Sequence, residues 1–301
     1  EKIKIIIIEG LENNWNLLDK LKNNMYVFIL LPIYYDKYKF KFMRDVIYSQ
    51  QSLFNIKNII IMCSDLDNML LSCEYNFSYL LLNQNSLLDY TIFSLLNSEK
   101  KYDLVINTRP EKWKRPYLAK KIKNLAIIKG YNFRKNDIYD LNELSPIFIN
   151  NDNRLTPEEV NTIYSQSYCG GIFSESEGAC YSSSEYLLSG LPVISTKSKG
   201  GRDIWYTSHN SIIVEPTEES VYEAVILCKQ KILSGEFDPV LIRNEHIKMS
   251  NEMRNDFIEF VQNIFDVNNI SIKSLEYWNK NYYNKMRQTM KLQEALNIIS
   301  K

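Results

Sequence analysis

Two carboxylates stand eight residues apart in the stretch SESEGACYSSSEYLLSGLPVIST, which occupies residues 174–196. Glu177 lies beside a glycine, and Glu185 lies further along a segment with helical character. Eight residues are about 2.2 turns of an α-helix, so both carboxylates are expected on nearly the same face. A carboxylate can accept two hydrogen bonds from the cis-diol of a ribose or a hexose. An ordinary solvated helix face is the alternative, because most carboxylates are exposed.

The neighbouring segments predict that this stretch follows the carboxyl end of a strand. The run GGIFS is predicted as a strand and residues 179–189 as a helix. Open α/β sheets bind ligands at the carboxyl ends of their strands. The backbone N–H groups of Gly178 and Ala179 would then lie at a helix N-terminus, which attracts anions. A plain helix start is the alternative for these two residues.

The rest of the chain alternates strand-like and helix-like runs, which predicts an α/β fold with parallel sheets. Strands are predicted over residues 2–8, 26–31, 58–62, 77–82, 102–107, 145–149, 170–174, 192–195 and 211–214. Helices are predicted over residues 40–51, 87–96, 117–129, 156–165, 179–189 and 218–233, and the tail from about residue 241 is predicted helical. Thr156 followed by Pro157 is typical of a helix start.

The central motifs resemble the donor-site signature of retaining glycosyltransferases with the GT-B architecture, especially the large family 4. That signature is E-x7-E, then E-x-L/M-A/S-x-G-x-P-V, then a Gly-Gly loop. Glu177 and Glu185 fit the first part, EYLLSGLPV fits the second, and Gly200 with Gly201 fits the third. In NSIIVEPTEESVYEAV a later family segment is also similar, with Ser211 in place of the usual glycine.

A second part of the resemblance lies upstream, in NTRPEKWKRP. The family usually shows G-R-x4-K after the first strand of its C-terminal domain, and Arg109 and Lys114 keep that five-residue step. The resemblance implies that both bind the donor diphosphate and stabilise the leaving group. Ordinary surface charge is the alternative, and Lys112 or Arg115 could replace Lys114. The match covers about residues 102–225.

The resemblance implies two Rossmann-like α/β domains facing a cleft, with a helical tail. Residues 1–98 would form the acceptor domain, residues 99–240 the nucleotide-sugar donor domain, and residues 241–301 a tail that packs back across the domains. The tail stretch SLEYWNKNYYNKMRQ could instead touch a membrane, although it lacks a long apolar face.

The implied activity is transfer of a hexosyl unit from a nucleotide diphosphate sugar to a hydroxyl of a glycan or glycolipid, as in polysaccharide biosynthesis. The family retains anomeric configuration and needs neither metal nor cofactor; a UDP-sugar is the first expected donor and a GDP-sugar the second. Glu185 would hold the ribose hydroxyls and Glu177 the donor sugar, with Gly178, Ala179, Gly200 and Gly201 lining the donor site. A non-catalytic nucleotide-sugar-binding or scaffold protein of the same fold, or a related hydrolase, phosphorylase or epimerase, is the alternative.

The amino-acid composition limits the classes of molecule that the protein is expected to bind. The 301 residues carry 36 basic and 36 acidic side chains, so no net charge favours nucleic acid. Five cysteines without a C-x-x-C pair and two histidines predict reduced thiols and no metal site. A cytoplasmic location is expected, with the inner face of the membrane as a place of action. The start does not resemble a signal peptide, although it begins at Glu1 and the natural chain can be longer.

Other polar residues carry weaker predictions. Many family members place a histidine near the reacting sugar in the N-terminal domain, but this chain has none before His209, for which a loop is expected. Asn83, Asn85 and Asp89 follow a predicted strand and could line the acceptor site, or serve as caps. Residues 147–150 could touch the base or form a loop. The D-x-D in CSDLDNM is interpreted as a loop.

Overall fold

The computed structural model describes residues 3–11, 15–51, 54–131, 137–151, 153–281 and 284–286, together with residues 294 and 297. The chain divides into two compact units. Unit 1 consists of residues 1–88 and 250–301, and unit 2 consists of residues 89–249. Both units are α/β, with a parallel sheet in each, as the alternating pattern predicted.

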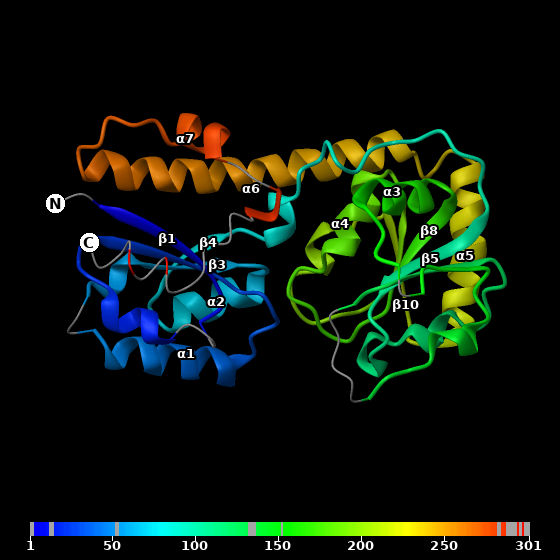
Figure 1. The fold of residues 1–301 in the computed structure, drawn as a ribbon, viewed down its shortest axis with the longest axis horizontal. Helices are drawn as coiled ribbons and strands as arrows, with labels where there is room; N and C mark the ends of the chain where they lie inside the picture. The colour runs from blue at the N-terminus through cyan, green and yellow to red at the C-terminus, as the bar shows by residue number, and fades with distance from the viewer. Residues whose placement is uncertain are drawn as a thin grey trace. The chain divides into compact units, whose positions relative to one another are not determined.

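Unit 1 is built on a four-stranded parallel sheet with helices on both faces (Figure 1). Its strands follow the order β1 (Lys4–Glu9), β2 (Met25–Leu30), β3 (Ile59–Cys63) and β4 (Ser78–Leu81). One face is covered by α1 (Lys37–Ser49) and α2 (Leu66–Glu74), and the other by the second part of α6 (Pro239–Val267). The helix α7 (Ser274–Asn281) packs against α6.

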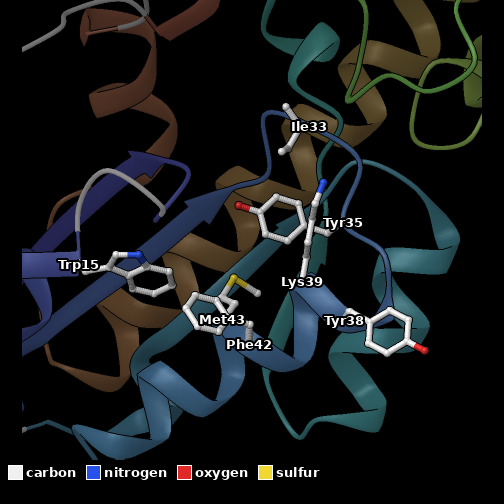
Figure 2. A pocket seen from close by; sticks show the side chains of 7 residues that line it. All are labelled: Trp15, Ile33, Tyr35, Tyr38, Lys39, Phe42 and Met43. Carbon is white, nitrogen blue, oxygen red and sulfur yellow. The ribbon is translucent and has the colours of Figure 1, made fainter. Parts of the chain in front are cut away.

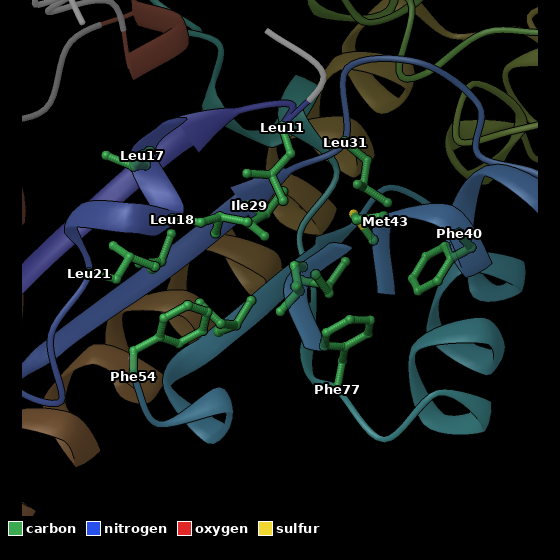
Figure 3. Close-up of a cluster of buried hydrophobic side chains, with 14 of the residues drawn as sticks. Leu11, Leu17, Leu18, Leu21, Ile29, Leu31, Phe40, Met43, Phe54 and Phe77 are labelled. Carbon is green, nitrogen blue, oxygen red and sulfur yellow. The ribbon is translucent and has the colours of Figure 1, made fainter. Parts of the chain in front are cut away.

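Alternating side chains of β2 fill the two layers of unit 1. Ile29 is fully buried in the core cluster drawn in Figure 3, together with Phe40 of α1. Phe28 points to the opposite face, because successive residues of a strand alternate. Its ring meets that of Phe257 on α6 at 5.5 Å, and Phe257 in turn meets Trp278 of α7 at 5.3 Å. The helical tail therefore completes the hydrophobic core of unit 1.

Unit 2 contains a six-stranded parallel sheet in the order β10-β9-β8-β5-β6-β7. Its strands are β5 (Tyr102–Thr108), β6 (Leu125–Lys129), β7 (Phe148–Ile149), β8 (Ser167–Ile172), β9 (Val193–Thr196) and β10 (Ser211–Val214). The helices α3 (Pro157–Ser165) and α4 (Tyr181–Leu188) cover one face and α5 (Glu218–Leu233) the other (Figure 1). The chain runs outward from β5 to β7 and then returns to the other side of β5. The direction in which the chain adds strands to the sheet therefore reverses between β5 and β8, which is the topological switch point of the sheet.

Short 3-10 helices connect these elements. They are η1 (Trp15–Lys20), η2 (Ile56–Asn58), η3 (Gln84–Leu87), η4 (Lys112–Lys114), η5 (Pro116–Ala119), η6 (Leu141–Leu144), η7 (Asp203–Trp205) and η8 (Asn284–Met286). None of the helices in the described ranges combines the length and the apolar character needed to cross a membrane. The predicted tail stretch 274–288 includes residues 282–283 and 287–288, which lie outside the described residues.

All nine predicted strands are present among the described residues, with ends shifted by a few positions. The helix over 218–233 is confirmed, and Thr156 forms a capping box with Glu159 at the start of α3. Two helix predictions are wrong. Residues 88–96 are not helical, and residues 117–129 divide into η5 and the buried strand β6. The loop interpretation of CSDLDNM is also wrong, because Asp65 caps α2 and Asp67 lies in its first turn.

The contact between β8 and α4 tests this packing directly. A Cβ atom on Gly170 would lie 2.4 Å from the Tyr186 ring, far inside van der Waals contact. We expect Gly170→Ala to lower the free energy of unfolding by about 2 kcal/mol in denaturant titrations, because overpacking forces the ring or the strand to move. Adding Tyr186→Leu should recover part of that loss. A Gly170→Ala variant as stable as the wild type would contradict this close contact.

Candidate functional site

An ion pair joins the segments that follow β5 and β8. Lys114, at the end of η4, pairs with Glu177, which lies between β8 and α4. The Lys114 side chain is 15% exposed and that of Glu177 is 10% exposed. Because β5 and β8 flank the point where the strand order reverses, the ion pair lies at the place where open parallel sheets bind ligands. Two residues predicted from separate motifs are thus in direct contact.

A buried arginine supports the carboxylate of this pair. Ser174 Oγ donates to Glu177 Oε1 at 2.6 Å. Arg202, which is fully buried, donates through Nη1 to Ser174 O at 3.1 Å and through Nη2 to the carbonyl oxygen of Thr196. Its Nε also pairs with Asp203 at 2.7 Å. Arg202 therefore ties the ends of β8 and β9 together beneath Glu177.

The glycine loop runs alongside the Glu177 segment. The N–H of Glu177 donates to Lys199 O at 2.9 Å, and the N–H of Gly201 donates to Gly178 O at 2.7 Å. Gly200 has a φ of +95°, a conformation that L side chains rarely adopt. The predicted residues Gly178, Gly200 and Gly201 therefore lie in two neighbouring loops. Ala179 is 1% exposed, and its side chain packs in the interior.

Arg109 and Lys114 both lie against the ring of Trp113. The Arg109 guanidinium carbon is 5.4 Å from the centre of the Trp113 ring, and Lys114 Nζ is 4.3 Å from the same point. Arg109 Nε also pairs with the buried Glu111 at 3.0 Å. The segment after β5 therefore places two cations against one aromatic ring, and cations are the groups that bind a diphosphate.

Glu185 is held separately, on α4. It is 8% exposed, and Tyr164 of α3 donates from its hydroxyl to Glu185 Oε2 at 3.3 Å. The same hydroxyl accepts a hydrogen bond from Asn107 Nδ2 at 2.6 Å. Burial, with the nearby Glu185 carboxylate, raises the pKa of Tyr164 well above its ordinary value. The phenol therefore stays protonated and orients the carboxylate.

The expectation that Glu177 and Glu185 share one helix face is wrong. The helix α4 begins at Tyr181, so Glu177 precedes it, and Cys180 at the N-cap has a left-handed φ of 58°. Each carboxylate instead contacts a different group: Lys114 for Glu177 and Tyr164 for Glu185. The prediction from helical spacing was wrong because the chain turns sharply at Cys180, before the helix begins. Burial, together with the nearby Glu177 carboxylate, raises the pKa of the Cys180 thiol to about 12.

The alternatives to Lys114 are engaged elsewhere. Lys112 is exposed and pairs with Asp137 at 3.0 Å, and Arg115 pairs with Glu175 at 2.7 Å. Three residues with weaker predictions make structural hydrogen bonds. Asn83 caps η3, Asp89 accepts from the N–H of Thr91 at 2.9 Å, and Asn150 accepts from the N–H of Lys129 at 2.6 Å.

Two further residues carried weaker predictions. Asn85 is buried within η3, and His209 lies in an exposed loop. The sequence analysis assigned no role to Ser174, Tyr164, Arg202 or Asn107. The only local sign for Arg202 was its place directly after the glycine pair.

Comparison with protein-family models and with curated protein sequences found no match. Solved structures are similar. TarM of S. aureus matches with a TM-score of 0.61 and 15% identity, over 85% of this chain and 54% of TarM. HepE of Anabaena, solved with UDP, matches with a TM-score of 0.57 and 10% identity, over 87% of this chain and 78% of HepE. The chain has the GT-B glycosyltransferase fold.

A third GT-B structure, the pneumococcal O-GlcNAc transferase GtfA in complex with UDP and GlcNAc, matches with a TM-score of 0.57 and 14% identity. The match covers 80% of this chain and 53% of GtfA. This GT-B chain therefore spans about half the length of TarM and GtfA. In the described residues, no cluster of three or more histidine, cysteine or acidic side chains is arranged to hold a metal ion.

The ion pair predicts a strong coupling between Lys114 and Glu177. Because both side chains are largely buried, Lys114→Met alone or Glu177→Gln alone should cost about 3 kcal/mol of unfolding free energy. The double variant should cost clearly less than the sum, since neither charge is then left unpaired. Urea titrations of the four proteins measure this. Additive losses would mean that the two side chains do not interact.

Thiol labelling tests the packing around Cys180. Cys73 is exposed, Cys63, Cys169 and Cys228 are buried, and Cys180 is partly buried with a raised pKa. We expect one thiol to react rapidly with Ellman's reagent at pH 8, and Cys73→Ser to remove that phase. Rapid labelling in Cys73→Ser would show that Cys180 is more open than this packing allows.

Proposed function

We propose that this protein is a retaining glycosyltransferase that transfers a hexosyl unit from a nucleotide diphosphate sugar to a hydroxyl group of a glycan or lipid-linked glycan. The observation that carries the proposal is the Lys114–Glu177 ion pair at the switch point of the unit 2 sheet. The GT-B fold supports it, and so does the similarity of the central motifs to family 4 enzymes. A UDP-sugar is the first donor to test and a GDP-sugar the second.

The proposed donor site lies in unit 2, on the segments that follow β5 and β8. Lys114 and Arg109 would neutralise the diphosphate, because two cations beside one Trp113 ring match its charge. As the bond from sugar to phosphate breaks, negative charge grows on the leaving diphosphate. The same two cations would stabilise that charge more in the transition state than in the ground state, and this difference is what lowers the barrier.

Glu177 and Glu185 would recognise sugar hydroxyls. When the diphosphate draws Lys114 away, the Glu177 carboxylate becomes available to a donor sugar hydroxyl while Ser174 and Arg202 keep it in place. Glu185, oriented by Tyr164, would accept hydrogen bonds from the ribose diol. Charge neutralisation by Lys114 and Arg109 makes the proposed transfer independent of a metal ion. The proposal assigns acceptor binding to the N-terminal region, residues 1–98, and donor binding to residues 99–240. It places the enzyme at the inner face of the membrane.

Nucleotide binding tests this assignment. A thermal-shift panel of UDP, GDP, ADP and CMP, with EDTA present, should show one nucleoside diphosphate that raises Tm by about 4–10 °C at a hundred times its Kd. Glu185→Gln and Tyr164→Phe should each weaken that nucleotide about tenfold, because a carboxylate hydrogen bond is lost or misdirected. Glu223→Gln, an exposed carboxylate on α5, is the matched control and should bind normally.

Transfer is tested with the sugar conjugate of the selected nucleotide and simple glycoside acceptors, with NMR of the product. The proposal predicts the anomeric configuration of the donor in the product and loss of transfer in Lys114→Ala. An inverted product would contradict retention. Nucleotide binding without any turnover would favour the non-catalytic alternative, and no binding in the panel would contradict the donor site.

A further inference from the structure

A separate cavity of about 380 Å³ opens in unit 1, among segments that follow β1 and β2. Figure 2 shows its lining side chains, which come from η1, from the loop after β2 and from α1. They are Trp15, Ile33, Tyr35, Tyr38, Lys39, Phe42 and Met43. The volume lies within the range of small-molecule sites, about 300–1,000 Å³. Carboxyl ends of parallel strands are also the usual ligand side of such a sheet.

The lining is unusual for a solvent-exposed position. Tyr38 is 85% exposed, Phe42 60% and Ile33 46%, although all three are large and apolar or aromatic. Tyr35 and Met43, at 2% and 1%, form the buried part of the cavity. Large exposed hydrophobic groups gathered around a cavity mark a binding surface rather than a random distribution.

The chemistry of the lining selects the class of ligand. Sugars need polar partners for each buried hydroxyl, and an unpaired hydroxyl weakens binding strongly. Carboxylate and amide side chains, which supply those partners in most sugar sites, are absent from the seven lining residues. Their carbon-rich surfaces instead match an alkyl or isoprenyl chain, or an aryl group.

The single charged lining residue sets the polarity of the ligand. Lys39 is exposed on α1, and its Nζ lies 3.4 Å from the neutral carbonyl oxygen of Tyr34. The neighbouring lysines on α1 differ, because Lys37 pairs with Glu74 at 2.7 Å and Lys41 lies 4.0 Å from Asp45. An anionic group at the mouth of the cavity would therefore meet the Lys39 ammonium.

We propose that this cavity binds the apolar end of an acidic acceptor, a chain-like or aryl group that carries a phosphate next to Lys39. This inference rests on the proposed function, because only a glycosyltransferase has an acceptor. It specifies that acceptor as a glycan attached to an apolar phosphate. Sugar units of the acceptor would lie outside the cavity, where water can satisfy their hydroxyls.

Calorimetric titration with decyl phosphate below its micelle concentration tests the proposal on the full chain. We expect one saturable site, with binding at least tenfold weaker for decanol, because the charge is lost, and for maltose, because the mainly carbon lining lacks the carboxylate and amide partners that its many hydroxyls need. Phe42→Ser and Ile33→Ser should each weaken decyl phosphate about tenfold through lost apolar contact. Both positions are exposed, so folding should be retained.

Two matched control variants distinguish binding in the cavity from non-specific binding to exposed apolar or basic side chains. Leu70→Ser removes an equally exposed leucine on α2 away from the lining, and Lys41→Gln removes a lysine next to the site. Both should bind decyl phosphate like the wild type, whereas Lys39→Gln should bind it about tenfold more weakly and bind decanol unchanged. Equal losses in cavity and control variants, or tighter binding of maltose, would overturn the proposal.

Nucleotide titrations on the same variants keep the two proposals distinguishable. Phe42→Ser and Lys39→Gln should bind the selected nucleoside diphosphate normally. A wild type that binds decyl phosphate but no nucleotide would remove the glycosyltransferase assignment and leave the cavity as an acidic-lipid site. A wild type that binds nucleotide but not decyl phosphate would overturn the cavity proposal alone.

Discussion

A largely buried charge needs a partner, and the Lys114–Glu177 ion pair meets that need while no diphosphate is bound. Much of unit 2 is arranged around it: β5 and β8 bring the two segments together, Ser174 and Arg202 fix the carboxylate, and the glycine loop follows the same backbone. Under the proposed function, a donor diphosphate replaces one partner of the pair. The ion pair therefore keeps the two side chains in place for donor binding, and neither charge is unpaired before the donor binds.

The sequence predicted the members of this site better than their contacts. Lys114 and Glu177 were recognised in separate motifs, and the alternation of strands and helices predicted that both follow strands. Their direct pairing depends on which strands are neighbours, and that order cannot be read from local spacing. Arg202 was missed for a related reason: it donates to the backbone carbonyl oxygens of Ser174 and Thr196, and any residue type at those positions would offer the same oxygens.

The errors in the fold have similar causes. Residues 88–96 were predicted helical, but their carbonyl groups find long-range donors: Arg243 donates to Tyr90 O at 2.7 Å, and Arg254 donates to Leu88 O. The helix α2 was missed because its buried face is polar, formed by Asn68 and Ser72, while Leu70 is exposed. Hydrophobic periodicity finds helices that bury apolar faces, as α5 does, and fails where hydrogen bonds across the fold replace that pattern.

The central claim is that Lys114 leaves Glu177 to bind a diphosphate. The most direct measurement compares the calorimetric affinity of the selected nucleoside diphosphate with that of its monophosphate, in the wild type and in Lys114→Met. The account predicts that the diphosphate binds at least tenfold more tightly than the monophosphate in the wild type, and that Lys114→Met removes most of this difference. An equal preference for the diphosphate in both proteins would contradict it.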